Sequence, residues 1–173
     1  MKLGFALRVL GAVAFSVLAP AAHIELHAIS RAPIGNVGSA VLLSPDESEL
    51  YIAQGYANTV AVFSPRLNRV LKTIAVGNGP TSLAISGDGK RLFVGEGSGQ
   101  LSEVDTASGT VAPRHAGGPV FGLAIGADGE TLYLAMCRSG LRKLNTRTGQ
   151  VQTLYTQFCP WVSRCRPIKS RFG

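Results

Sequence analysis

One stretch decides the fold: Leu83-Ala84-Ile85-Ser86-Gly87-Asp88-Gly89-Lys90-Arg91-Leu92-Phe93-Val94-Gly95. A short apolar run ends in an Asp-Gly turn, which favours a tight hairpin, and a second apolar strand follows. A glycine- and serine-rich loop at 96–99 then separates this hairpin from the next strand. The pattern predicts short antiparallel strands joined by tight turns.

The same pattern occurs before and after this stretch. The matching aspartates, Asp46, Asp88 and Asp128, are 42 and 40 residues apart. Pro80 and Pro119 open the second and third copies, and Pro160 would open a fourth. Each copy also has a third and a fourth apolar stretch, as in 59–63 and 69–76. Four short strands in about 40 residues is the length of a β-propeller blade.

A single four-stranded blade cannot bury both of its faces, so blades must stack on one another. We therefore predict an all-β fold, a partial β-propeller with three four-stranded blades at about 35–76, 77–116 and 117–155, plus a stub of a fourth. The two end blades would each expose an apolar face, which predicts self-association through open blade faces.

The repeats resemble the YVTN-type β-propeller repeat over about residues 35–157. The matching runs are Ser44-Pro45-Asp46, Asn58-Thr59-Val60, Gly87–Val94, Val104–Gly109, Asp128-Gly129, Leu132–Ala135 and Asn145–Gly149. The resemblance implies a ring that usually has seven blades, and the pattern is lost after Pro160. We interpret the chain as a product truncated inside blade four. The alternative is a half-propeller completed by a second copy or by another chain.

The N-terminal segment 1–22 is predicted to be a secretory signal peptide. Lys2 and Arg8 precede an apolar stretch at 9–18, and small residues follow at 19–22. The stretch is shorter than the roughly 20 residues of a membrane span, although an uncleaved anchor is the alternative. We expect cleavage near Ala22, or later after Ala28, a periplasmic or secreted protein, and no stable membrane span afterwards.

The formal net charge of +7 is concentrated at the two ends of the chain. Between 23 and 157, where we place the partial propeller, 11 basic residues face 10 acidic ones. Segment 158–173, a degenerate basic tail or the start of a fourth blade, holds four basic residues and no acid. A nucleic-acid groove needs a basic stripe on the folded body, so we expect no nucleic-acid partner.

The sequence nominates no catalytic residue, cofactor or metal site. It has no Gly-x-Ser-x-Gly motif, and its three histidines are scattered. The repeated aspartates are interpreted as turn residues rather than calcium ligands. The three cysteines, Cys137, Cys159 and Cys165, allow a disulfide after export, and Cys137–Cys159 is our interpretation.

A binding surface is predicted on one rim of the propeller. The loop entering the first strand of a blade and the loop joining its second and third strands lie at the same end. The candidate residues there are Tyr56, Asn58, Glu96, Arg138 and Trp161, with the alternative that they are solvated loop residues.

We therefore interpret the protein as an exported, non-catalytic binding or interaction scaffold for a protein or small-molecule ligand. By resemblance, the alternative is a fragment or subunit of an exported propeller enzyme, quinoprotein-dehydrogenase-like or lactonase-like. A non-functional truncated remnant is the third interpretation.

Overall fold

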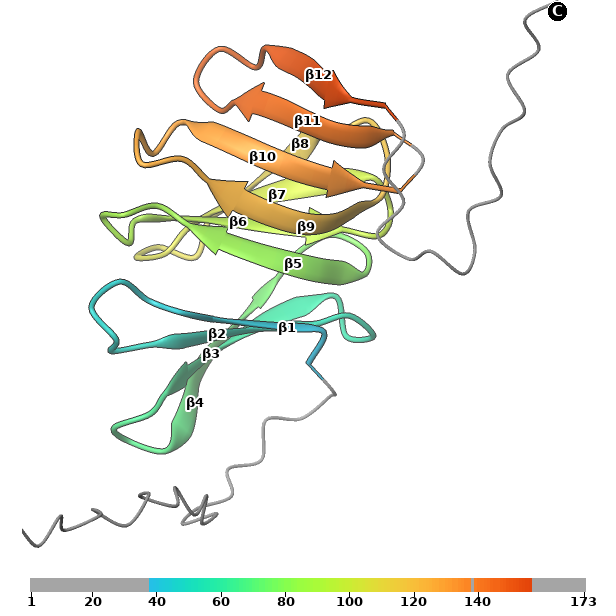
Figure 1. The fold of residues 1–173 in the computed structure, drawn as a ribbon. Helices are drawn as coiled ribbons and strands as arrows, with labels where there is room; N and C mark the ends of the chain where they lie inside the picture. The colour runs from blue at the N-terminus through green and yellow to red at the C-terminus, as the bar shows by residue number, and fades with distance from the viewer. Residues whose placement is uncertain (1–37, 138, 157–173) are drawn as a thin grey trace, which may run out of the picture.

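The computed structural model describes residues 38–137 and 139–156, which form twelve strands and no helix. Three four-stranded antiparallel sheets stack along the molecule (Figure 1). Blade 1 contains β1 (Ala40–Leu43), β2 (Leu50–Gln54), β3 (Thr59–Ser64) and β4 (Arg69–Ala75). Blade 2 contains β5 (Pro80–Ile85), β6 (Arg91–Glu96), β7 (Gln100–Asp105) and β8 (Val111–His115). Blade 3 contains β9 (Val120–Ile125), β10 (Thr131–Met136), β11 (Gly140–Asn145) and β12 (Val151–Tyr155).

The predicted all-β class with three four-stranded blades is confirmed. In each blade every strand pairs with the next strand along the chain, as a repeated hairpin pattern requires. Among the residues described, no helix is long and apolar enough to span a membrane. The predicted leader, Arg138 and the whole segment 158–173, with Cys159, Trp161 and Cys165, lie outside the described residues.

The aspartates close the first turn of each blade. Asp46 accepts hydrogen bonds from the Ser44 hydroxyl at 2.6 Å and from the Ser48 amide at 3.2 Å. Asp88 accepts the equivalent bonds, from the Ser86 hydroxyl and the Lys90 amide, in the turn between β5 and β6. In the turn between β9 and β10, where Gly126 replaces the serine, Asp128 accepts from the Glu130 amide and from the amide and hydroxyl of Thr131. These contacts agree with their interpretation as turn residues.

The hydrophobic core consists of the two interfaces between blades. Successive residues of β6 serve different interfaces, because Leu92 and Val94 pack against blade 1 while Phe93 packs against blade 3. All three are fully buried. A strand covered on both faces can be apolar at every position, which explains the unbroken apolar run that the sequence showed.

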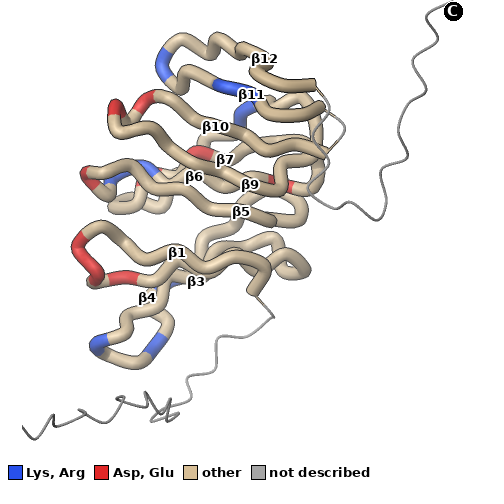
Figure 2. The backbone as a smooth tube through the Cα atoms, viewed as in Figure 1, with Lys and Arg blue, Asp and Glu red and all other residues tan. Residues whose placement is uncertain are grey.

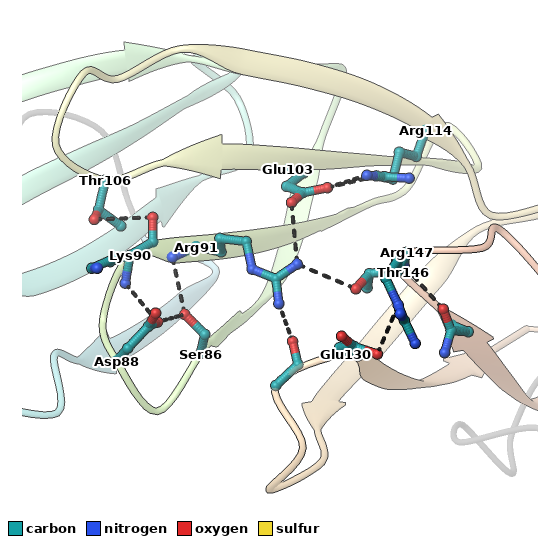
Figure 3. A network of polar contacts seen from close by, with 12 residues as sticks. Ser86, Asp88, Lys90, Arg91, Glu103, Thr106, Arg114, Glu130, Thr146 and Arg147 are labelled. Carbon is teal, nitrogen blue, oxygen red and sulfur yellow. Dashed lines mark hydrogen bonds and ion pairs between the residues drawn. The ribbon is translucent and has the colours of Figure 1, made fainter.

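Basic side chains also cross between blades. Lys72 of blade 1 donates to the Thr106 carbonyl of blade 2 at 2.6 Å. Arg91 of blade 2 donates to the Gly129 carbonyl and the Thr146 hydroxyl of blade 3 (Figure 3). It also lies over the Phe93 ring. On its own blade Arg91 pairs with Glu103 at 3.6 Å. Each interface therefore combines apolar packing with a cation that reaches the next blade.

Candidate functional site

The strand connections lie at two opposite rims of the stack (Figure 1). We call the end with the β1–β2, β5–β6 and β9–β10 turns the turn rim. The opposite end, with the β2–β3, β4–β5 and β6–β7 connections, is the entry rim. The candidate residues nominated from the sequence belong to the entry rim.

Tyr56, in the β2–β3 connection, is the most exposed large hydrophobic side chain among the residues described, at 93%. It therefore offers contact area to solvent at the entry rim. Asn58 in the same connection has a positive φ of 57°, and its side-chain oxygen accepts a hydrogen bond from the Gly79 amide at 2.9 Å. Asn58 thus holds the connection between blades 1 and 2.

Glu96, at the end of β6, is fully buried. Its Oε1 accepts hydrogen bonds from the Ser102 hydroxyl at 2.6 Å and the Gly77 amide at 3.1 Å, and its Oε2 accepts one from the Ser98 hydroxyl. Burying a carboxylate is tolerated only when donors replace the lost water, and three do so here. Glu96 of blade 2 and Asn58 of blade 1 therefore both bind backbone amides of the 76–79 connection.

The Glu96 carboxylate leaves no room for a side chain at position 77. A Cβ built on Gly77 would overlap the Glu96 carboxylate. The burial of Glu96 had a signal in the sequence, because its counterpart in the third copy is Met136, an apolar residue that is also fully buried. The counterpart in blade 1, Gln54, is likewise buried and accepts a hydrogen bond from Thr59.

The turn rim contains a cleft that the sequence did not indicate. It has a volume of about 550 Å³ and lies between the β1–β2 turn of blade 1 and the β5–β6 turn of blade 2. Its lining residues are Ser44, Pro45, Asp46, Ser48, Glu49, Tyr51, Gly87, Asp88, Gly89, Lys90, Thr106 and Ala107. Because the turns belong to different copies of the repeat, a spacing pattern within one copy could not show that they face each other.

The cleft carries more acid than base. Hydrogen bonds from Ser44 and Ser48 lower the pKa of Asp46 to about 2, and those from the Ser86 hydroxyl and the Lys90 amide lower the pKa of Asp88. Both carboxylates are therefore ionised at neutral pH, and Lys90 is the one cation among the lining residues.

At the inner wall of the cleft the Tyr51 hydroxyl donates to Glu49 at 2.7 Å. Burial, and then the neighbouring Glu49, raise the pKa of Tyr51 above its usual range, so it stays protonated. The cleft therefore offers carboxylates that can accept hydrogen bonds or face a cationic group.

No family model matches the chain. "Uncharacterized protein YncE" of Salmonella typhimurium is 40% identical over 55 residues, which is 32% of this chain and 16% of that protein. The chain thus spans about a sixth of the length of the curated relative it matches.

The solved structures that match the three stacked sheets are propellers. A chain of hydrazine synthase from Kuenenia stuttgartiensis has a TM-score of 0.63 at 26% identity, over 67% of this chain and 34% of that one. The WD40 repeats of RRP9 have a TM-score of 0.60 at 20% identity, over 66% of this chain and 37% of that one. The β-propeller domain of Cps50 (Swd1) from Myceliophteria thermophila has a TM-score of 0.61 at 14% identity, over 68% of this chain and 38% of that one. The fold is a partial β-propeller. This arc spans about a third of each solved chain.

Proposed function

We propose that the protein is an exported, non-catalytic binding scaffold in which the stacked blades present the turn-rim cleft to a ligand. The observation that carries the proposal is the cleft itself, because its walls come from two blades that apolar packing holds together. Concave sites between repeated units are common places for ligands.

The cleft favours a ligand that presents cationic or hydrogen-bond donor groups. Asp46, Glu49 and Asp88 supply carboxylates, whereas Lys90 is the one cation of the lining and Lys72 is held on the Thr106 carbonyl of the wall. A peptide with an arginine or lysine matches this arrangement, because charge-assisted hydrogen bonds to carboxylates are stronger than neutral ones.

Filling the cleft with a bulky side chain tests whether it is the binding site. Peptides are selected from a random display library on the purified chain, and their affinity is measured by calorimetry. Ala107→Tyr places a ring in the cleft without removing a side-chain hydrogen bond, and Ala57→Tyr is the matched control at the entry rim. Loss of affinity with Ala107→Tyr alone supports the cleft. Loss with Ala57→Tyr alone moves the binding surface to the entry rim and overturns the cleft assignment.

Export and repeat type are part of the same proposal. The leader at 1–22 supports export, and the recurring Asp-Gly turns support a YVTN-type repeat truncated in its fourth blade. The nearly balanced charge between 23 and 157 supports a partner other than nucleic acid. N-terminal sequencing of the protein from a periplasmic fraction should start after Ala22 or Ala28, and an intact Met1 there would refute the cleaved leader.

A second candidate is a fragment or subunit of an exported propeller enzyme. The match to a chain of hydrazine synthase, at 26% sequence identity, is the observation that favours this second candidate. Turnover of a lactone or of a quinone-dependent alcohol substrate by the purified chain, abolished by a cleft or rim variant, would refute the non-catalytic scaffold.

A further inference from the structure

Each blade has two faces with separate partners. We call the face toward the preceding blade the head face and the face toward the following blade the tail face. Leu83 and Leu92 lie on the head face of blade 2 and pack against blade 1. Tyr51 lies on the tail face of blade 1, and Phe93 on the tail face of blade 2. Every internal interface therefore joins a tail face to a head face.

At the two ends of the described arc the same positions are exposed. Val41 and Leu43 of β1 match Leu83 and Ile85 of β5 in register, because Val41 pairs with Ile52 as Leu83 pairs with Val94. Val41 is 61% exposed and Leu43 42%, whereas Leu83 is 9% exposed. Ile52, at the position of Val94, is 3% exposed, so Val41 and Leu43 are the exposed apolar part of a head face that is covered elsewhere.

The tail face of blade 3 shows the complementary pattern. Tyr133 matches Tyr51 and Phe93, which are 2% and 0% exposed, yet Tyr133 is 38% exposed. Phe121 and Tyr155, at 41% and 55%, add to the exposed apolar surface of this end blade. The exposed residues of the tail face of blade 3 and of the head face of blade 1 therefore occupy the positions of a contact that the described residues already make twice.

Charge also matches across this pair of faces. In the blade 2–blade 3 interface Arg91 reaches the Gly129 carbonyl in the β9–β10 turn. In blade 3 the position of Arg91 is occupied by Thr131, and the cation on the tail face is Lys143, which pairs in register with Tyr133 as Glu103 pairs with Phe93 in blade 2. The turn that would meet it on blade 1 contains Asp46 and Glu47 and is acidic, as Figure 2 shows.

We propose that two copies of this chain associate head to tail, with the tail face of blade 3 of each copy on the head face of blade 1 of the other. A second copy is the occupant we commit to, because its own end faces offer each exposed face the contact that the repeat makes within the chain. Head-to-tail contacts close into a ring when the rotation per copy permits it. Two arcs of three blades give six, within the four to eight blades of known propellers.

Sedimentation velocity of the purified full chain over a range of concentrations tests the proposal, with circular dichroism as the check on folding. A discrete dimer is expected. Leu43→Asp on the head face should weaken dimerisation by roughly a hundredfold or more, because it buries an unpaired charge. Tyr133→Ala on the tail face should weaken it by roughly tenfold or more, because it removes a ring from the contact. Tyr56→Asp, an equally polar change at the entry rim, should leave the dimer unchanged.

Swapping the charges of one predicted pair distinguishes a lost contact from a misfolded variant. Lys143→Glu and Glu47→Lys should each weaken the dimer by about fivefold, as expected for a partly exposed pair, and the double variant should restore it. Lys90→Glu in blade 2 is the matched charge reversal away from the end faces. A monomeric wild-type chain, a polydisperse ladder of larger species, or a double variant no better than the single ones would overturn the head-to-tail pair.

Discussion

Replacing Gly77 with alanine tests the contact between Glu96 and the connection that joins blades 1 and 2. Gly77 has no positive φ, so alanine fits its backbone and the substitution probes space alone. The added methyl group would occupy the position of the Glu96 carboxylate. Glu96 must then withdraw from the Gly77 amide and from the Ser102 hydroxyl.

The size of the effect follows from those bonds. Ser102 is 2% exposed, so its unpaired hydroxyl costs about 1–3 kcal/mol, and the half-buried Gly77 amide adds about 1 kcal/mol. Alanine recovers about 0.4–1 kcal/mol because it restricts the unfolded chain. Gly77→Ala should therefore lower the free energy of unfolding by about 2 kcal/mol. Glu96→Ala, which removes the acceptor, should lower it by about 3 kcal/mol.

Urea unfolding of the two single variants and the double variant, followed by circular dichroism, measures the coupling. The carboxylate that Gly77→Ala displaces is absent in the double variant, so its loss should be about 3 kcal/mol rather than the sum of about 5. Glu96→Gln keeps one acceptor oxygen and can donate to Ser98, so it should cost within about 1 kcal/mol. Additive losses in the double variant would refute the shared contact.

Three further predictions concern the turns and rims. Hydrogen bonds, first that from the Thr131 hydroxyl, lower the pKa of Asp128 from 3.8 to about 2, so its contribution to stability is present above pH 4 and lost as the pH falls from about 4 to 2. Asp128→Asn should therefore reduce the pH dependence of the free energy of unfolding in that window. An unchanged pH dependence would contradict the role given to these hydrogen bonds. Arg91→Leu keeps the packing on Phe93 but loses the hydrogen bonds to blade 3. Amide hydrogen exchange in the β9–β10 and β11–β12 turns should become faster, and the free energy of unfolding should fall by about 1 kcal/mol. Exchange rates equal to those of the wild type would argue against the cross-blade contact. Tyr56→Ala should change the free energy of unfolding by less than about 0.5 kcal/mol in urea titration, and a larger loss would show a structural role for this exposed ring.

The blades could be predicted because their determinants are local. An Asp-Gly turn between two apolar runs specifies a hairpin within a dozen residues, and Asp46, Asp88 and Asp128 repeat that signal at a fixed spacing. Stacking then follows from apolar residues at successive positions, as in β6. Neither inference needs contacts between distant residues, so both could be made from one sequence.

The candidate site was predicted less completely because it depends on contacts between copies. The sequence placed Glu96 at the entry rim but could not show that Gly77, nineteen residues earlier, donates to its carboxylate. The turn-rim cleft was missed for the same reason, since Asp46 and Asp88 belong to different blades. The exposure of Tyr56 could be predicted because a loop between two strands of one hairpin is a local feature, whereas its role in binding stays a prediction.

The two cross-blade cations stabilise the stack without constraining the side chains of the turns they reach. Lys72 and Arg91 both use a backbone carbonyl of the next blade, at Thr106 and at Gly129. Any residue supplies a carbonyl, so these bonds constrain the donor and the turn's shape but not the turn's side chains. The apolar interfaces constrain the strands alone. Turn side chains that make no capping bond, such as Ala107 in the cleft wall, can therefore change with the ligand while the packing of the blades stays the same.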